Sequence, residues 1–151
     1  MTLEPGDPAP EVRAPNQDGD VVEPDWAGVS VVYFYPRDDT PGCTTEAEQF
    51  QAELESYRDA DVTVYGVSVD DVDSHADFAA EHGVEFDLLA DPDGEVVEAF
   101  DVERTRGVAS RTTFVVVDRV VQAVYTGVDP DGHARNVLAD LLETGVASLD
   151  E

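Results

Sequence analysis

The residues best suited to chemistry lie in one short segment around Cys43, the only cysteine of the chain. A thiol in the first turn of a helix faces unpaired amide N–H groups and the positive end of the helix dipole, and both stabilise a thiolate over a thiol. Thr40, three positions earlier, offers a hydroxyl that could donate a hydrogen bond to sulfur or to a bound oxygen. Arg37, or an arginine from elsewhere in the chain, would add the cation that such a site needs. The segment therefore predicts a nucleophilic thiolate.

Two features of the same segment argue for an inert side chain instead. A lone cysteine is most often a small core residue. Asp38, Asp39 and Glu46 lie close to Cys43 in the sequence, and nearby carboxylates disfavour a further negative charge. The spatial arrangement decides which effect is larger, because a contact at hydrogen-bonding distance escapes the screening that salt imposes on distant charges.

The elements around this segment place Cys43 just beyond the end of a buried strand. Residues 29–35 are β-branched and aromatic and stop at Pro36, which predicts a central strand. Residues 43–58 are polar with apolar side chains at helical spacing, which predicts an amphipathic helix. The apolar positions are Ala47, Phe50, Leu54 and Tyr57. Further strands are predicted at 62–69, 86–90, 113–117 and 120–125, and further helices at 74–82, 96–100 and 134–142.

The order of these elements predicts the fold class. Strands and helices alternate and end in a strand pair and a helix, which is typical of an α/β fold with a mixed central sheet and helices on both faces. Prolines within residues 5–15 predict an N-terminal extension, and Asp18-Gly19 predicts a turn between two short strands. We interpret residues 1–151 as a single domain that resembles the thioredoxin fold. Ligands of open α/β sheets bind beyond the carboxyl ends of the strands, which is where Cys43 is predicted to lie.

Two motifs carry a resemblance to a known family. The first, Pro36-x-x-x-Thr40-x-x-Cys43, is similar to the active-site signature of peroxiredoxins, and of the bacterioferritin-comigratory subgroup in particular. The second, residues 107–118, resembles the segment that carries the active-site arginine of that family, which is Arg111 in this chain. The similarity extends over almost the whole chain, from about Pro5 to Leu142.

This resemblance implies a thiol peroxidase. Cys43 would attack the O–O bond of hydrogen peroxide or an alkyl hydroperoxide and become a sulfenic acid. Thr40 would hydrogen-bond the sulfur and the peroxide, and Arg111 would hold the thiolate and stabilise the charge that develops as the O–O bond breaks. Pro36 would limit the access of water, and Glu46 would orient Arg111. No metal or other cofactor is expected.

One departure from the family pattern bears on how the sulfenic acid is reduced. Many members of the subgroup carry a resolving cysteine five residues after the peroxidatic one, where this chain has Glu48. No resolving cysteine is present, so the chain is expected to be a one-cysteine peroxidase that needs an external thiol, either a thioredoxin-like protein or a low-molecular-weight thiol. Overoxidation of Cys43 to a sulfinic acid is the expected failure.

Two other functions share the predicted fold. A thiol–disulfide oxidoreductase needs Cys-x-x-Cys, but Thr40 and Glu46 occupy the two possible partner positions. A redox-silent binding module with a thioredoxin fold would keep Cys43 as a bystander. That module would react with peroxide no faster than a free thiol does.

The histidines and the tryptophan lie outside these motifs. His75 and His82 are seven residues apart on one predicted helix and could share a metal. We interpret His75 instead as a solvated helix residue and His82 as a favourable charge at the helix C-terminus. His133 falls in a predicted turn without an evident partner, and Trp26 is predicted to pack under the N-terminal segment.

Composition narrows the partners and the compartment. The 151 residues include 35 acidic and 8 basic side chains, for a net charge of −27, and all eight cations are arginine. Such a surface is repelled by phosphate backbones and anionic lipid, so nucleic-acid and membrane binding are disfavoured, although DNA mimicry is left open. The chain starts without the basic and apolar regions of a signal peptide, and a single cysteine cannot form an internal disulfide. We therefore expect a cytoplasmic protein.

The charge also makes a prediction about solvent. A protein of this mass exposes roughly 7,500 Å², so carboxylates occur about once per 210 Å². Their mutual repulsion weakens when molar salt shortens the Debye length to about 3 Å. The sequence thus predicts a halophilic protein whose stability requires salt.

Overall fold

A five-stranded mixed sheet forms the centre of the protein in a computed structural model. The structure describes residues 3–38, 40–105 and 107–146. The strand order is β5-β4-β3-β8-β9. The strands β3 (Val29–Phe34), β4 (Val62–Ser68) and β5 (Asp87–Ala90) are parallel, and the hairpin of β8 (Thr112–Val117) and β9 (Val120–Thr126) adds two antiparallel neighbours. The predicted mixed sheet and its late hairpin are confirmed.

The register of β3 brings two distant segments to one edge of the sheet. Each residue of β3 pairs with β4 on one side and with β8 on the other, and its last residue, Phe34, lies opposite Thr112. The chain leaving β3 therefore starts beside the residue that enters β8, which is Arg111. Both segments lie at the carboxyl end of β3, where open α/β sheets hold their ligands.

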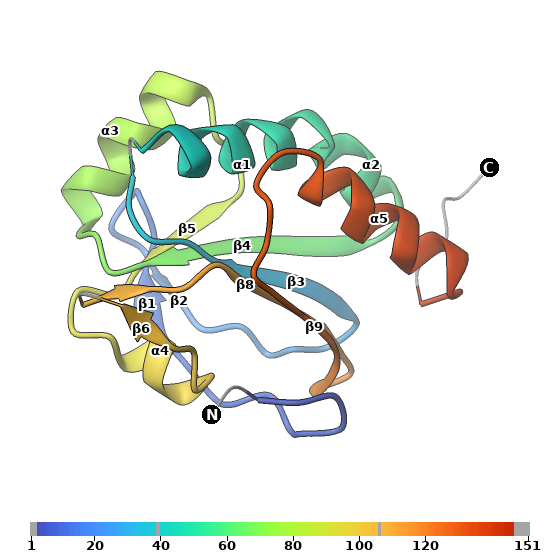
Figure 1. Cartoon of the computed structure of the whole chain (residues 1–151). Coiled ribbons are helices and arrows are strands. Elements are labelled where there is room, and N and C mark those ends of the chain that lie inside the picture. Colours follow the sequence, from blue (N-terminus) through green and yellow to red (C-terminus); the bar gives the residue numbers. More distant parts are fainter. Residues whose placement is uncertain (1–2, 39, 106, 147–151) are drawn as a thin grey trace.

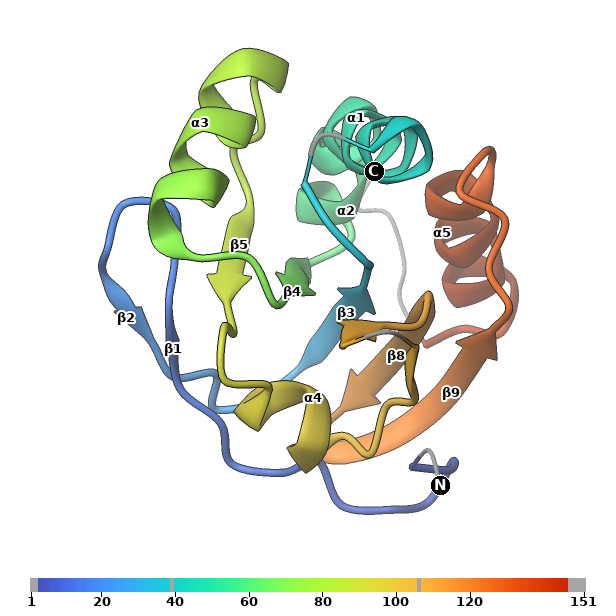
Figure 2. The same cartoon turned by 60° about the vertical axis from the view of Figure 1, so that its left-hand side comes forward.

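Two apolar layers cover the sheet (Figures 1 and 2). The helices α1 (Pro41–Ala52), α2 (Leu54–Asp59), α3 (Val72–His82) and α5 (His133–Glu143) lie on one face, and α4 (Glu95–Ala99) lies on the other. Alternate residues of β3 serve the two layers, because successive side chains of a strand point to opposite faces. Tyr33 packs with Phe50 of α1, whereas Phe34 packs with Phe100 and Phe114. Helices on both faces are thus confirmed.

The predicted helix over residues 43–58 forms as two helices. It begins two residues earlier, at Pro41, which suits the first helical position because proline has no N–H to leave unpaired. It is interrupted at Glu53, whose backbone leaves the helical region at φ −95° and ψ 1° before α2 starts. The apolar positions 47, 50, 54 and 57 are all buried, so the predicted periodicity holds across the interruption.

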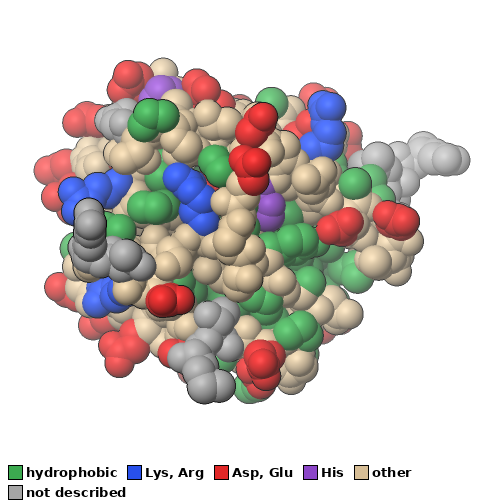
Figure 3. All heavy atoms as spheres, viewed as in Figure 1, with side chains coloured by type: hydrophobic (Ala, Val, Ile, Leu, Met, Phe, Trp, Pro, Cys, Tyr) green, Lys and Arg blue, Asp and Glu red, His purple; other side chains and the backbone are tan. Residues whose placement is uncertain are grey.

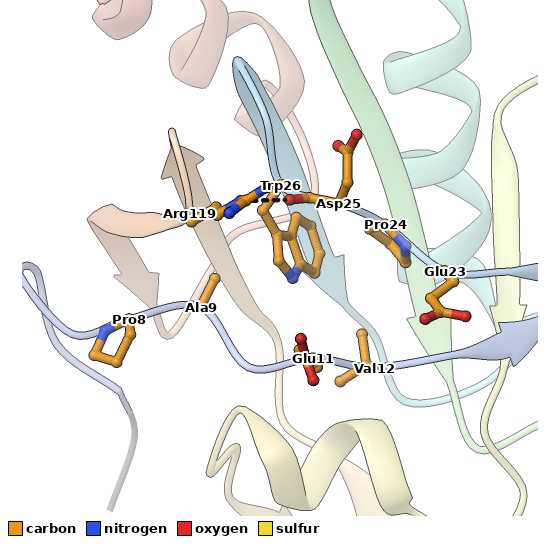
Figure 4. A pocket seen from close by; sticks show the side chains of 9 residues that line it. All are labelled: Pro8, Ala9, Glu11, Val12, Glu23, Pro24, Asp25, Trp26 and Arg119. Carbon is orange, nitrogen blue, oxygen red and sulfur yellow. Dashed lines mark hydrogen bonds between the residues drawn. The ribbon is translucent and has the colours of Figure 1, made fainter.

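The N-terminal segment packs on the face that α4 covers. Its two short strands, β1 (Ala14–Pro15) and β2 (Val21–Val22), pair on either side of the predicted turn. Trp26 is buried beneath this segment as predicted, and its indole N–H donates to the carbonyl of Pro10 at 2.8 Å. A pocket of about 480 Å³ beside it is lined by apolar side chains, by three acidic residues and by Arg119, whose Nε donates to the carbonyl of Asp25 (Figure 4). This pocket contains none of the predicted site residues.

A short hairpin between α4 and β8 was not predicted from the sequence. It consists of β6 (Arg104–Thr105) and β7 (Val108–Ala109), which pair antiparallel and lead into Arg111. Two-residue strands carry too little periodicity to stand out in a sequence.

None of the described helices is long and apolar enough to cross a membrane.

Candidate active site

Cys43 is the third residue of α1 and is almost fully buried, with 1% of its surface exposed. The first intrahelical hydrogen bond is made by the amide of Thr44 to the carbonyl of Thr40 at 2.9 Å. The amides of Gly42 and Cys43 come before that bond, at the positive end of the helix dipole. The predicted setting of the thiol, in the first turn of a helix after a buried strand, is therefore present.

Arg111 supplies the cation beside the sulfur. Its Nη2 donates to the Sγ of Cys43 at 3.3 Å, and its side chain is mostly buried. Arg37, the other cation considered from the sequence, is exposed. Gly42 leaves the space that the guanidinium occupies, because a Cβ at this position would lie 2.6 Å from Nη2 of Arg111. The site thus combines a buried sulfur with a close, directed positive charge.

Glu46 holds the other end of the guanidinium. Its Oε1 accepts from Nη1 of Arg111 at 3.1 Å, and its carboxyl group is 1% exposed. Burial raises the pKa of this carboxyl from its ordinary 4.5 to about 7, although the charge and hydrogen bond of Arg111 act in the opposite direction. Its second oxygen, Oε2, has no hydrogen-bond partner among the described residues. The predicted pairing of Glu46 with Arg111 is therefore seen in the geometry.

Thr40 and Pro36 lie on the loop that joins β3 to α1. Thr40 precedes the first residue of the helix, and its hydroxyl donates to the carbonyl of Arg37 at 3.1 Å. The hydrogen of that hydroxyl is thus engaged within the loop, and the lone pairs of Oγ1 remain as acceptors. Pro36 is half-buried directly after Tyr35, the buried residue that follows β3. Asp39, a carboxylate considered from the sequence, lies outside the described residues.

Asp38 and His75 form a hydrogen-bonded group beneath this loop that sequence reasoning missed. The expectation that His75 is solvated is wrong, because its side chain is 0% exposed. Its Nδ1 lies 2.7 Å from Oδ2 of Asp38, and its Nε2 lies 3.0 Å from the carbonyl oxygen of Leu89. These two hydrogen-bond partners compensate for the burial of the imidazole, which the sequence had suggested would be exposed to solvent. A buried His75 could not be recognised beforehand, since Asp38 is 37 residues away along the chain.

Asp70 completes the same group. Its Oδ2 accepts from the backbone amide of Asp38 and from the hydroxyl of Ser68, each at 2.7 Å. The ligand-type atoms of Asp38, Asp70 and His75 lie within 4.8 Å of one another. Every one of them takes part in a hydrogen bond inside the group, and it is this network that ties the loop to the body of the protein.

His133 also differs from its prediction. It is the first residue of α5, is buried, and has its Nε2 2.8 Å from the hydroxyl of Thr113. Burial lowers the pKa of His133 to about 4, although the charge of Asp140 acts in the opposite direction. His82 ends α3 as predicted, and its Nδ1 lies 3.2 Å from the carboxylate of Glu48.

Comparison with known proteins agrees with this geometry. The family model described as AhpC/TSA matches residues 5–124. Peroxiredoxin Bcp of Xanthomonas campestris is 42% identical over 120 residues, which are 74% of this chain and 74% of that protein. A cysteine-to-serine mutant of Xylella fastidiosa PrxQ superposes with a TM-score of 0.89 at 30% identity, covering 96% of this chain and 99% of the other.

A further solved structure carries a description of activity. It is the bacterioferritin comigratory protein of Xanthomonas campestris, described with an alkyl peroxide reduction activity, with a TM-score of 0.82 at 34% identity over 89% of this chain and 92% of the other. The sequence match, the superposition and the buried cysteine with its arginine agree. The chain belongs to the AhpC/TSA family and is a peroxiredoxin of the bacterioferritin-comigratory type.

Proposed function

We propose that this protein is a one-cysteine thiol peroxidase that reduces hydrogen peroxide or alkyl hydroperoxides with Cys43 as the nucleophile. The observation that carries this assignment is the contact of 3.3 Å between Nη2 of Arg111 and the Sγ of Cys43 in the first turn of α1. A buried cysteine without a reaction to perform does not need a directed guanidinium. Removal of hydroperoxides is an antioxidant activity.

The chemical step is a two-electron transfer from sulfur to the peroxide. The Cys43 thiolate attacks one peroxide oxygen, the S–O bond forms as the O–O bond breaks, and the second oxygen leaves with the bonding electron pair. The proton of the hydroperoxide passes to the leaving alkoxide, which departs as an alcohol, or as water when the substrate is hydrogen peroxide. The sulfenate that remains becomes a sulfenic acid when it takes a proton from solvent.

The surrounding groups act on the charges of that step. Nη2 of Arg111 faces the sulfur, so it stabilises the thiolate before attack and the oxygen that develops charge during it. Glu46 fixes the guanidinium through Nη1. The hydroxyl of Thr40 donates its hydrogen to the carbonyl of Arg37, and the lone pairs of Oγ1 can accept the peroxide O–H. Pro36, half-buried at the start of the loop, would limit the access of water. These four roles are part of the proposal.

The oxidised cysteine needs a thiol from another molecule. Cys43 is the only cysteine of the chain, and Glu48, at the position of the resolving cysteine in many relatives, is exposed and paired with His82. An external thiol would displace water from the sulfenic acid to form a mixed disulfide, and a second thiol would release Cys43. A thioredoxin-like protein and a low-molecular-weight thiol are the two reductant classes. We place the reaction in a cytoplasm, because a reducing compartment supplies such thiols.

Trapping of the sulfenic acid tests the proposal. Reduced protein is mixed with one equivalent of hydrogen peroxide, and Cys43 is captured with a sulfenate-specific reagent. Wild type should label within seconds, Cys43→Ser should not label, and Arg111→Ala should react about 10²- to 10³-fold more slowly, as expected when a directed donor is lost. A wild-type thiol that reacts no faster than free cysteine would instead support the redox-silent binding module, and an Arg111→Ala variant as fast as wild type would refute the role of the arginine.

A further inference from the structure

The loop that carries Thr40 into α1 is attached to the rest of the protein through Asp38. The carboxylate of Asp38 accepts from the hydroxyl of Tyr35 at 2.7 Å, from the hydroxyl of Ser74 at 2.8 Å, and contacts Nδ1 of His75 at 2.7 Å. These partners come from the end of β3 and from the first turn of α3. One side chain therefore joins the loop before Cys43 to two different elements.

Both ring nitrogens of His75 have hydrogen-bond partners inside the protein. The carbonyl oxygen of Leu89 can only accept, so Nε2 must carry a hydrogen. Asp38 already accepts from two hydroxyl groups, and although burial alone would raise its pKa, the hydrogen bonds and charge of His75 and the two hydroxyl groups lower it. Tyr35, Ser74 and His75 thus converge on one carboxylate, and Asp38 and His75 form a buried hydrogen-bonded pair.

We propose that His75 and Asp38 are positioning residues for the peroxide reaction, which hold residues 36–38 and Thr40 in the alignment that the attack on the O–O bond requires. This inference rests on the proposed function. Neither side chain touches the sulfur in the described contacts, so both act through the loop. A buried hydrogen-bonded pair suits this task because breaking it leaves buried polar groups without partners, which makes the closed arrangement more favourable than a loosened one.

The two reactions of Cys43 respond differently to a loosened loop. Attack on a hydroperoxide needs sulfur, both peroxide oxygens, Thr40 and Arg111 in one arrangement. Alkylation by iodoacetamide needs only a thiolate that the reagent can reach. A displacement of about 1 Å can cost up to about 10²-fold in an aligned reaction. Loss of the pair should therefore slow the reaction with peroxide and leave the alkylation rate unchanged or faster.

The experiment compares His75→Asn, Asp38→Asn, the double variant and wild type. Sulfenic acid formation and iodoacetamide alkylation are each followed by mass spectrometry after rapid quenching, at one pH. We expect each single variant to react with peroxide about tenfold or more slowly, and the double variant to be no slower than the worse single one, because the two residues act as a unit. His82→Asn is the matched control, since His82 lies on the same helix as His75 but contacts Glu48 instead of the loop.

Two further measurements keep the test decisive if the buried variants fold poorly. Ser74→Ala removes one donor to Asp38 and should lower the peroxide rate less, in the same direction. In wild-type protein, ¹⁵N NMR should show a hydrogen on Nε2 of His75, because its partner, the carbonyl oxygen of Leu89, can only accept.

The outcomes separate the two proposals. Wild type that forms no sulfenic acid refutes the proposed function itself. Wild type that reacts while His75→Asn and Ser74→Ala react equally fast overturns only the positioning role. Equal losses in the peroxide and alkylation rates, or a His75 ring whose Nε2 carries no hydrogen, also overturn it.

Discussion

At the scale of single residues, Gly42 determines whether Arg111 can reach the sulfur. In Gly42→Ala, the new Cβ would lie 2.6 Å from Nη2 of Arg111. The guanidinium of Arg111 must therefore move, which it can do because it is the far end of a flexible side chain. Alanine is also better than glycine within a helix by up to about 1 kcal/mol. Gly42→Ala should therefore keep or raise the melting temperature while the rate of sulfenic acid formation falls at least about tenfold. Thermal melts and the trapping assay measure the two effects.

Thr44→Ala is the matched control for this substitution. It changes a residue in the same turn, about 200° around the helix from Gly42. Its melting temperature and peroxide rate should stay near those of wild type. A Gly42→Ala variant with an unchanged peroxide rate would show that the contact of Arg111 with the sulfur does not matter.

Glu46 makes the stability of the protein depend on pH. Its carboxyl has a pKa of about 7 when folded, against an ordinary value of 4.5, so the folded state holds this proton more tightly than the unfolded state does. The contribution of Glu46 to the unfolding free energy is favourable below pH 4.5 and is lost as the pH rises towards 7. The difference in unfolding free energy between Glu46→Gln and wild type should therefore grow by about 3 kcal/mol across this interval. Urea unfolding at a series of pH values measures it.

Other titrating groups largely cancel in that difference, because both proteins share them. A difference that stays constant with pH, or that shrinks as the pH rises, would mean that Arg111 keeps Glu46 ionised. The peroxide rate of Glu46→Gln provides a second check on whether a neutral partner still orients the guanidinium.

At the scale of elements, local sequence patterns predicted the strands and helices, whereas side-chain burial that depends on contacts between distant residues could not be predicted. The β-branched run ending at Pro36 and the apolar spacing from Ala47 to Tyr57 located β3 and the helices after it. Arg111 was identified from the resemblance of residues 107–118 to a family segment, and it lies directly before a strand that pairs with β3. The burial of His75 was not, because it depends on Asp38 and Leu89, which come from other parts of the chain.

The short helix α4 depends on one carboxylate outside it. Asp91 accepts from the amides of Val96 and Val97 at 3.0 and 2.9 Å, whereas the residue before the helix, Gly94, has no side chain to cap it. Asp91→Ala leaves these buried amides unpaired and should cost about 1–3 kcal/mol of unfolding free energy. Asp93→Ala, in the same turn but exposed, should cost little. Equal melting temperatures for the two variants would contradict this account.

At the scale of the whole molecule, the surface carries a charge that few contacts neutralise. The accessible area is 7651 Å², close to the value expected from the mass, and it holds most of the 35 acidic side chains. Figure 3 shows acidic groups spread along the rim of one face, with apolar and neutral atoms over much of its centre. On α3, Asp73, Asp77 and Glu81 are exposed at intervals of four residues, so like charges follow one another along one side of the helix. Such pairs are destabilising by about 0.2–0.5 kcal/mol each in dilute salt.

Salt should therefore stabilise this protein, and α3 should contribute to the effect. We expect the melting temperature to rise continuously from millimolar to molar KCl, because the Debye length falls from about 30 Å at 0.01 M to about 3 Å at 1 M. The variant Asp77→Asn/Glu81→Gln removes two charges from the α3 row and should melt higher than wild type in dilute salt, with the advantage shrinking in molar KCl. Sucrose, which favours the folded state without screening charge, serves as the control and should leave that advantage unchanged. A melting temperature independent of KCl would reject the halophilic interpretation, and an advantage of the variant that persists in molar KCl would assign its stability to helix propensity rather than to charge.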